Sequence, residues 1–289
     1  MSPAPLLPTA ATRRAPGSLL GGRVALPAQP RRVVSLVSGL TEALWALGLE
    51  ERVVGVSQYC ARYVDVGARP VAGDYLQVDA AQLAALQPDL VLMTGGVQLG
   101  VARKLAAAGW PVYVLPLPES FYGILENIRR LGALLGEMPA AQALTLRLEQ
   151  EAAALRATAP AVRPRIYAEL WFGRHARRAG GLTFIHDLLT LAGGEPLGAA
   201  EPTGYPPLDL AATAAQRPEV VVVFWEADDH AVDVPALLRE RGWTGRWPFR
   251  VIEAGIARGQ NLIHDGPSLL ETARWLRAQL PAANHDLAP

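Results

Sequence analysis

The chain has 289 residues, of which 51% are hydrophobic, and its 27 Lys and Arg balance 27 Asp and Glu to a formal net charge of zero. This length exceeds a typical single domain and suffices for two α/β lobes with separate cores. The neutral balance argues against a nucleic-acid-binding protein, whose binding face is normally basic. The single cysteine, Cys60, cannot form an internal disulfide. No apolar run reaches the roughly 20 residues that span a bilayer.

The first residues are rich in Pro, Ala, Thr and Gly. Arg13 and Arg14 are followed by a short mixed segment, whereas a secretory signal carries an apolar stretch of roughly 7–15 residues after its basic patch. We therefore expect residues 1–22 to be a disordered tail. The protein then either acts inside the cell or has an export signal that is absent from this chain.

Residues 23–118 alternate short apolar runs with helical patterns. Buried parallel strands are predicted at Val33–Val37, Val53–Val56, Leu90–Met93 and Val112–Leu115. Helices are predicted between them at Thr41–Leu49, Asp79–Leu86 and Val101–Ala108. Strands that alternate with helices over short connections predict a parallel sheet with helices on both faces.

Two helical patterns then follow each other without a strand, at Glu119–Leu135 and Pro139–Ala157. The second has Pro in its first turn and would be about 30 Å long. Strand patterns resume at Arg165–Leu170, Val220–Phe224 and Val251–Ile252. The predicted fold is α/β, with two Rossmann-like lobes at 23–118 and 161–289, a connector at 119–160 that holds one long helix, and a ligand cleft between the lobes.

An internal repeat relates the two lobes. Residues 75–91, YLQVDAAQLAALQPDLV, match residues 205–221, YPPLDLAATAAQRPEVV, at an offset of 130 positions. Tyr75 aligns with Tyr205, Asp79 aligns with Asp209, and a Pro followed by an acidic residue precedes an apolar run in both copies. We infer a duplication, with each Asp as a helix N-cap. Because ligands gather beyond the carboxyl ends of parallel strands, Tyr75 and Tyr205 are expected on opposite sides of the cleft.

Aromatic residues accumulate in the loops at predicted strand ends. They are Tyr59, Tyr75, Trp171, Tyr205 and Trp225. Flat aromatic side chains suit a large planar or partly apolar ligand, because each supplies much contact area at low entropic cost. Packing within the lobes is the alternative explanation, and for the two tryptophans both explanations stay open.

Polar candidates lie at the same strand ends. Thr94 and Gly95 follow an apolar strand, and their backbone could approach a ligand closely. Glu169 and Arg174 could hold polar groups of a ligand or form a surface ion pair. The acidic residues and histidine of 226–230 could ligate a metal, although their spacing matches no standard metal motif.

The sequence contains no recognisable catalytic constellation. Phosphate-loop, nucleophile-elbow and dinucleotide-binding patterns are absent from strand-to-helix junctions. Cys60 has no histidine or aspartate pattern to activate it, and is either incidental or a ligand contact. We therefore expect a binding protein rather than an enzyme.

Several short stretches, in this order and spacing, resemble the substrate-binding proteins of ABC importers with a helical backbone, which carry cobalamin, haem and ferric siderophores. The matching stretches are PRRVVSLV at 30–37, TE at 41–42, LGL at 47–49, RVVGVS at 52–57, LQPDLV at 86–91, LAGG at 191–194 and GP at 266–267. The resemblance covers Arg23–Leu280. It is strongest toward the cobalamin-binding branch, through Ser57–Cys60, Tyr75 and Tyr205.

The resemblance implies a monomeric periplasmic or cell-envelope protein, without a cofactor of its own, that captures cobalamin or, second, haem or a ferric siderophore. It also implies that His264, just before the Gly-Pro pair, contributes to the cleft. An ABC permease is the implied partner, docked through a glutamate on each lobe, but Ala81 and Ala211 occupy the corresponding positions. A cytoplasmic cofactor-handling protein or enzyme on the same scaffold is the alternative. An oxyanion receptor would require small polar donors rather than paired aromatics.

Overall fold

The computed structural model describes residues 12–15, 18–21, 24–170, 172–173, 177–224 and 232–280. These residues divide into two compact units. Unit 1 comprises the described chain up to Pro118, together with Tyr122–Leu148 and Asp265–Pro267. Unit 2 comprises Glu119–Phe121, Glu149–His264 and the described chain from Ser268 onward.

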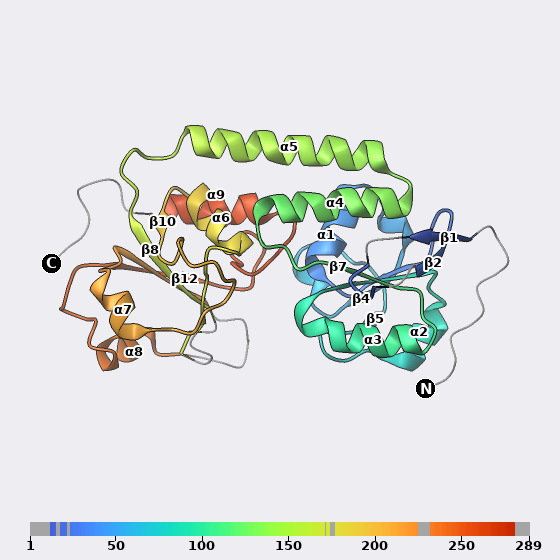
Figure 1. Cartoon of the computed structure of the whole chain (residues 1–289), viewed down its shortest axis with the longest axis horizontal. Helices are drawn as coiled ribbons and strands as arrows, with labels where there is room; N and C mark the ends of the chain where they lie inside the picture. Colours follow the sequence, from blue (N-terminus) through green and yellow to red (C-terminus); the bar gives the residue numbers. More distant parts are fainter. Residues whose placement is uncertain are drawn as a thin grey trace. The chain divides into compact units, whose positions relative to one another are not determined.

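Unit 1 is built on a five-stranded parallel sheet with the order β5-β4-β3-β6-β7 (Figure 1). Its strands are β3 (Val33–Ser35), β4 (Val53–Ser57), β5 (Val71–Gly73), β6 (Leu90–Thr94) and β7 (Val112–Leu115). Its helices are α1 (Ser38–Ala46), α2 (Ala80–Leu86), α3 (Leu99–Ala107) and α4 (Phe121–Leu135), with 3-10 turns at Glu50–Arg52, Cys60–Arg62 and Gly96–Gln98.

Both faces of this sheet are covered, by α2 and α3 on one side and by α1 and α4 on the other (Figure 1). All five residues of β6 are buried. Val91 and Met93 point into the core that Leu83 of α2 and Leu105 of α3 complete. A strand that is buried on both faces reads as a continuous apolar run. This explains why β6 was predictable from the sequence.

An antiparallel pair, β1 (Thr12–Ala15) with β2 (Val24–Pro27), precedes the sheet. We expected residues 12–15 to belong to a disordered tail, so this strand differs from the expectation. Between the two strands the chain lies along β7, where Val114 N donates to Ser18 Oγ and Leu19 N donates to Val114 O, both at 3.1 Å. These two hydrogen bonds satisfy the backbone N–H and C=O of Val114 on the edge strand β7, and they leave no periodic side-chain pattern in the sequence.

Unit 2 repeats the architecture with the parallel order β10-β8-β11-β12, and a short β9 pairs antiparallel with β8. Its strands are β8 (Arg165–Leu170), β9 (Arg177–Arg178), β10 (Glu195–Pro196), β11 (Val220–Phe224) and β12 (Arg250–Ala254). Its helices are α6 (Phe184–Leu191), α7 (Leu210–Ala215), α8 (Val234–Glu240) and α9 (Leu269–Gln279). Because β4-β3-β6-β7 and β10-β8-β11-β12 share one order, the two units have the same sheet topology, as a duplication requires.

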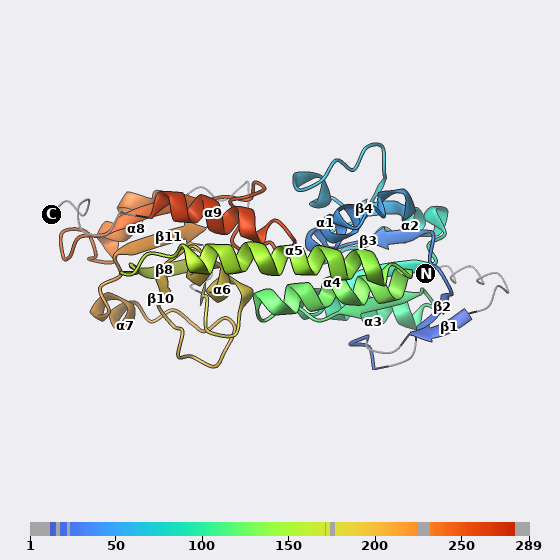
Figure 2. The ribbon, with the colours of Figure 1, turned by 90° about the horizontal axis from the view of Figure 1, so that it is seen from above.

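The long helix α5 (Met138–Ala157) runs without interruption for 20 residues, beginning in unit 1 and ending in unit 2 (Figure 2). In unit 1 it packs so closely on α4 that a side chain at Gly132 would collide with Ala141. In unit 2 its last turn is held by Arg277, which donates to Leu155 O at 2.7 Å. The predicted long helix is thus present, and Glu119–Phe121 and Asp265–Pro267 are two further places where the chain changes unit.

None of the described helices combines the length and apolar character that crossing a membrane demands.

Candidate ligand-binding site

The repeat places a tyrosine in an equivalent loop of each unit. Tyr75 lies between β5 and α2, Tyr205 lies between β10 and α7, and both are partly exposed. The acid four residues later caps the following helix. Asp79 Oδ1 accepts from the backbone N of Ala81 and of Gln82 at 2.9 Å, and Asp209 Oδ1 accepts from the N of Ala212 at 2.9 Å. The two predicted N-caps are therefore confirmed.

Unit 1 brings two of the predicted tyrosines into one stack. The ring centroids of Tyr59 and Tyr75 are 5.1 Å apart with an interplanar angle of 19°. The guanidinium of Arg62 lies 5.3 Å from the Tyr59 centroid, and Ser38 Oγ is 3.1 Å from the Tyr75 hydroxyl. Tyr59 follows β4 and Tyr75 follows β5, so the stack lies at the carboxyl edge of the sheet. Aromatic pairs of this geometry contribute beyond the area they bury.

The loop that carries Tyr59 is fixed by contacts farther along it. Trp45 Nε1 donates to Asp65 O at 3.2 Å. Arg69 donates to Val53 O at 2.9 Å and to Glu50 O at 2.8 Å, while its guanidinium lies 4.8 Å from the Trp45 ring. The later part of this loop is thereby attached to the body of unit 1. These contacts hold the loop that carries Tyr59 against unit 1.

Cys60, the residue after Tyr59, is fully buried. Its Sγ is 3.1 Å from the hydroxyls of Thr41 and Ser57, and Thr41 Oγ1 donates to Ser35 Oγ at 2.8 Å. Burial raises the pKa of the Cys60 thiol, against the smaller opposing effect of the Ser57 and Thr41 hydrogen bonds. A buried thiol of raised pKa is unreactive. Cys60 is therefore part of the support of the loop.

The Tyr75 phenol stays neutral across the physiological range. Burial raises its pKa most, and the negative charge of Asp265 raises it further, while the Ser38 hydrogen bond acts in the opposite direction. Asp265 belongs to the short late segment of unit 1 and lies so close to the start of α1 that a side chain at Gly39 would collide with it. This environment favours Tyr75 as an aromatic surface and a hydrogen-bonding group.

Three other predicted site residues are covered by the chain itself. Thr94 is buried, and its backbone N donates to Oε1 of Gln98 at 2.9 Å. Gly95 is also buried, and its N donates to Leu115 O at 2.8 Å. His264, in unit 2, is buried as well. The turn after β6 therefore exposes Gly96 and the residue after it to solvent, in place of Thr94 and Gly95.

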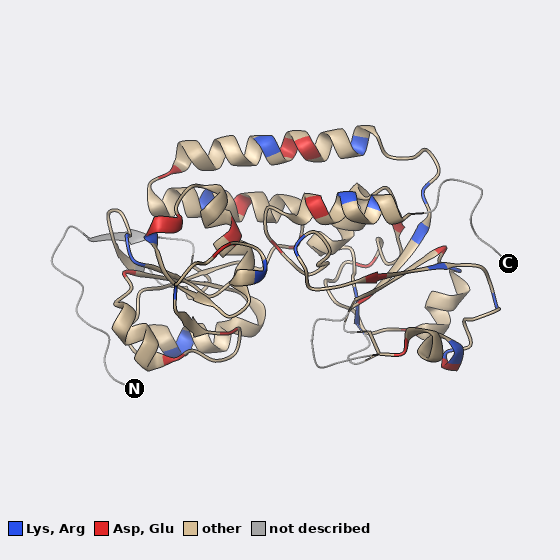
Figure 3. Ribbon diagram, turned by 180° about the vertical axis from the view of Figure 1, so that it is seen from behind, with Lys and Arg blue, Asp and Glu red and all other residues tan. Residues whose placement is uncertain are grey.

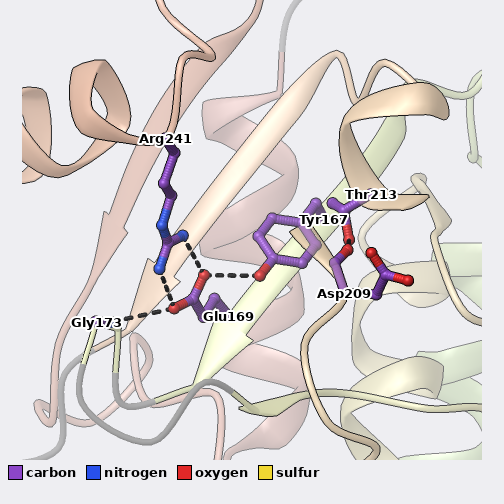
Figure 4. Close-up of polar contacts among 6 residues, drawn as sticks. All are labelled: Tyr167, Glu169, Gly173, Asp209, Thr213 and Arg241. Carbon is purple, nitrogen blue, oxygen red and sulfur yellow. Dashed lines mark hydrogen bonds and ion pairs between the residues drawn. The ribbon is translucent and has the colours of Figure 1, made fainter. Parts of the chain in front are cut away.

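The carboxyl end of β8 carries a buried ionic network (Figure 4). Glu169, fully buried, accepts from the Tyr167 hydroxyl at 2.6 Å, from Arg241 at 2.6 and 2.8 Å, and from Gly173 N at 3.1 Å. The Arg241 guanidinium also lies 4.9 Å from the Phe172 ring. Burial raises the pKa of Tyr167, and the adjacent Glu169 charge adds to this effect. In the described part of the chain, both carboxylate oxygens of Glu169 thus accept hydrogen bonds from protein donors.

This network corrects one expectation. We considered Glu169 as a ligand contact or a surface partner of Arg174, but it is buried and its ionic partner is Arg241. Its position instead fixes the backbone at Gly173, where the loop after β8 begins. Arg174, Trp171, Trp225 and the possible metal cluster at 226–230 lie outside the described residues. Within the described ranges no group of three His, Cys, Asp or Glu side chains is arranged to hold a metal ion.

Basic and acidic residues are interspersed along the chain in both units (Figure 3), in keeping with the zero net charge. Ala81 and Ala211, at the starts of α2 and α7, are exposed. The neighbouring Asp79 and Asp209 are occupied as helix caps. At these two equivalent positions the described surface is therefore apolar.

Residues 33–246 match the family described as periplasmic binding protein. The chain belongs to this family. Its members are non-enzymatic binding components of transport systems, and among its relatives are cobalamin- and haem-binding proteins. The family assignment and the two-unit α/β fold agree with the resemblance inferred from the short stretches.

The chain is 32% identical over 212 residues to a cobalamin-binding protein of Halobacterium salinarum, a match that covers 71% of this chain and 57% of that protein. The chain thus spans little more than half the length of that relative. It is 27% identical over 256 residues to a vitamin B12-binding protein of Yersinia pestis, covering 83% of this chain and 90% of the other. A solved periplasmic haem-binding protein of Pseudomonas aeruginosa aligns with a TM-score of 0.66 and 26% identity, covering 86% and 92% of the two chains.

Sequence reasoning missed several residues that shape the site. Ser38 and Arg241 lie far along the chain from Tyr75 and Glu169, so no local pattern connects them. Asp74, whose Oδ1 accepts from Leu76 N and Gln77 N just beside Tyr75, was detectable in principle, because Asp before a turn commonly accepts hydrogen bonds from the next backbone N–H groups.

Proposed function

We propose that this chain captures cobalamin and delivers it to an ABC-type importer of the cell envelope. The observation that carries the proposal is the partly exposed Tyr59–Tyr75 stack at the carboxyl edge of one sheet, with Tyr205 in the equivalent loop of the other unit. Tyr75 and Tyr205 would each contact the bound molecule. Cobalamin-binding relatives support this choice of ligand.

Haem or a ferric siderophore is the second candidate, favoured by the haem-binding structural relative. Haem iron in proteins is held by an axial His, Cys, Met or Tyr ligand. Cys60 and His264 are buried, and the Tyr75 hydroxyl lies 3.1 Å from Ser38 Oγ and has a raised pKa, which leaves Tyr59 and Tyr205 as the described site candidates for an axial ligand. The Tyr59–Tyr75 stack supports a ligand that is held by contacts with ring faces, whereas haem would need Tyr59 or Tyr205 as its axial ligand.

The surface that docks to a permease would make apolar contacts at Ala81 and Ala211. Ala81 and Ala211 offer no carboxylate to a basic partner, and Asp79 and Asp209 already accept hydrogen bonds from their own helices. We propose that docking to a permease takes place without an acidic anchor at these positions.

Isothermal titration calorimetry of the purified chain tests the ligand assignment. Cyanocobalamin, dicyanocobinamide, haemin and a ferric hydroxamate siderophore are titrated separately, and cyanocobalamin is expected to bind most tightly. Tighter binding of haemin would replace cobalamin with the second candidate. Absence of heat with all four would reject this class of ligand.

A further inference from the structure

The loop between β5 and α2 is a tight turn organised by Asp74. Its Oδ1 accepts from Leu76 N at 2.6 Å and from Gln77 N at 2.7 Å. The backbone N of Asp74 in turn donates to Gln77 O at 2.8 Å. This is an Asx turn, in which a carboxylate takes the place of a backbone carbonyl. Tyr75 is the residue that the turn encloses.

The base of the turn is equally constrained. Gly73 has a φ of 151°, and any side chain there would collide with the Gln77 carbonyl oxygen. Asp79 N donates to Ala72 O at 2.9 Å, which joins the far end of the loop to β5. Only glycine adopts this backbone region without strain. Position 73 therefore accommodates only glycine, and a backbone hydrogen bond joins the two ends of the loop.

The Tyr75 side chain is fixed at its other end by the stack with Tyr59 and by Ser38. A side chain that becomes ordered only on binding weakens affinity, because its lost conformational freedom opposes association. In this loop, contacts within unit 1 hold both the backbone and the ring of Tyr75. Asp74 makes none of the ring contacts, yet it holds the backbone from which the ring projects.

We propose that Asp74 is a positioning residue for ligand binding, which acts by holding Tyr75 in its binding orientation. This inference rests on the proposed function, since it requires Tyr75 to contact the ligand. Asp74 itself does not touch the ligand.

The second copy of the repeat uses a different device at the same place. Gly204 aligns with Asp74, and Pro206 and Pro207 align with Leu76 and Gln77. Proline has no backbone N–H, so a carboxylate at position 204 would find no donor in either residue. The Tyr205 loop is held instead by Gly180 N, which donates to Gly204 O at 2.7 Å, and by Arg177, which donates to Tyr205 O at 3.2 Å. The role of Asp74 is therefore specific to unit 1.

A double-mutant cycle with cyanocobalamin tests the inference. Dissociation constants are measured by calorimetry for the parent chain, Asp74→Ala, Tyr75→Ala and the double variant. Asp74→Ala is expected to weaken binding roughly 3- to 10-fold, the range for ordering one side chain on binding. The double variant should match Tyr75→Ala alone, because Asp74 acts through that ring. Independent, multiplying losses would overturn the inference.

Two conservative variants and a control separate positioning from general stability. Asp74→Asn keeps the acceptor oxygen and should bind as the parent does, while Asp74→Ser, a weaker acceptor, serves if the alanine variant does not fold. Asp79→Ala removes a helix cap from the same loop and should lower stability without changing affinity.

Hydrogen exchange at Leu76 and Gln77 should accelerate in Asp74→Ala, with or without ligand. Unchanged exchange, or unchanged affinity in Asp74→Ala, refutes the role of Asp74, whereas unchanged affinity in Tyr75→Ala refutes the tyrosine contact itself.

Discussion

Gln87 and Arg217 occupy the same left-handed backbone conformation, with φ of 45° and 46°, and they are the two non-glycine residues with positive φ in the described part of the chain. They are separated by the same offset as Tyr75 and Tyr205. Each follows a helix of the repeat and precedes a Pro-acid pair. The carboxylate of the acid then accepts a hydrogen bond from the backbone at the start of the adjacent strand. Asp89 accepts from Arg32 N, and Glu219 accepts from Arg165 N, both at 2.9 Å. The repeat thus extends to an unusual backbone conformation.

Glycine should relieve this conformation. The left-handed region costs a non-glycine residue roughly 1–2 kcal/mol, and part of the gain is offset by the greater freedom of glycine in the unfolded chain. We expect Gln87→Gly and Arg217→Gly each to raise the thermal midpoint, while Gln87→Val lowers it. Differential scanning calorimetry provides the measurement. A lower midpoint for both glycine variants would contradict the explanation.

Removal of either repeat tyrosine should weaken cobalamin binding. Tyr75→Ala and Tyr205→Ala are each expected to cost about 1–3 kcal/mol of binding free energy, as central aromatic contacts do. Tyr75→Phe keeps the stacked ring and loses only the Ser38 hydrogen bond, so its affinity should stay close to that of the parent chain. Calorimetric titration with cyanocobalamin measures all three. Equal losses in Tyr75→Phe and Tyr75→Ala would assign the effect to the hydroxyl instead of the ring.

The Glu169–Arg241 pair should be costly to break. Arg241 has 7% and Glu169 has 0% of its side chain exposed, so Glu169→Gln leaves a buried guanidinium without its counter-charge. Loss of one partner of a buried pair costs about 3–5 kcal/mol. Urea denaturation should show this drop in unfolding free energy.

The exposed Arg258–Glu271 pair, at 2.7 Å, is the matched control. Both of its side chains are 45% exposed, so Glu271→Gln should change stability by at most about 1 kcal/mol. If the two variants lost equal stability, burial of the Glu169 pair would not be the reason for its effect.

Alkaline pH should destabilise the fold. The pKa values of Tyr75, Tyr167 and Cys60 are raised chiefly by burial, above ordinary values of 10.0 for the phenols and 9.0 for the thiol. As pH rises, the unfolded chain therefore releases these protons before the folded chain does. Their contribution to stability is complete below pH 9.0 and is lost from there upward, until the folded groups ionise.

Thermal midpoints measured at increasing pH test this expectation. The decline should be shallower in Tyr75→Phe, which cannot ionise at this position, and it should begin at higher pH in Cys60→Ser. A midpoint that stays constant from pH 9.0 upward in the parent chain would contradict the assignment.

Much of the fold could be predicted because its signals are local. The fully buried β6 and β11 read as apolar runs, and the caps Asp79 and Asp209 stand directly before their helices. Short pairings such as β9 with β8 carry too few residues for a pattern and form only when the sheet is present to receive them. For the same reason the β1–β2 pair was absent from the expectation.

The sequence by itself determined the repeat, the parallel architecture, the long helix and Tyr75 and Tyr205 as candidates, because each follows from periodicity, helix caps and spacing along the chain. The tertiary structure alone decided which side chains meet. It stacked Tyr59 on Tyr75, paired Glu169 with Arg241, and buried Thr94, Gly95 and His264. Contacts and burial depend on how distant segments pack, and no local pattern specifies that packing.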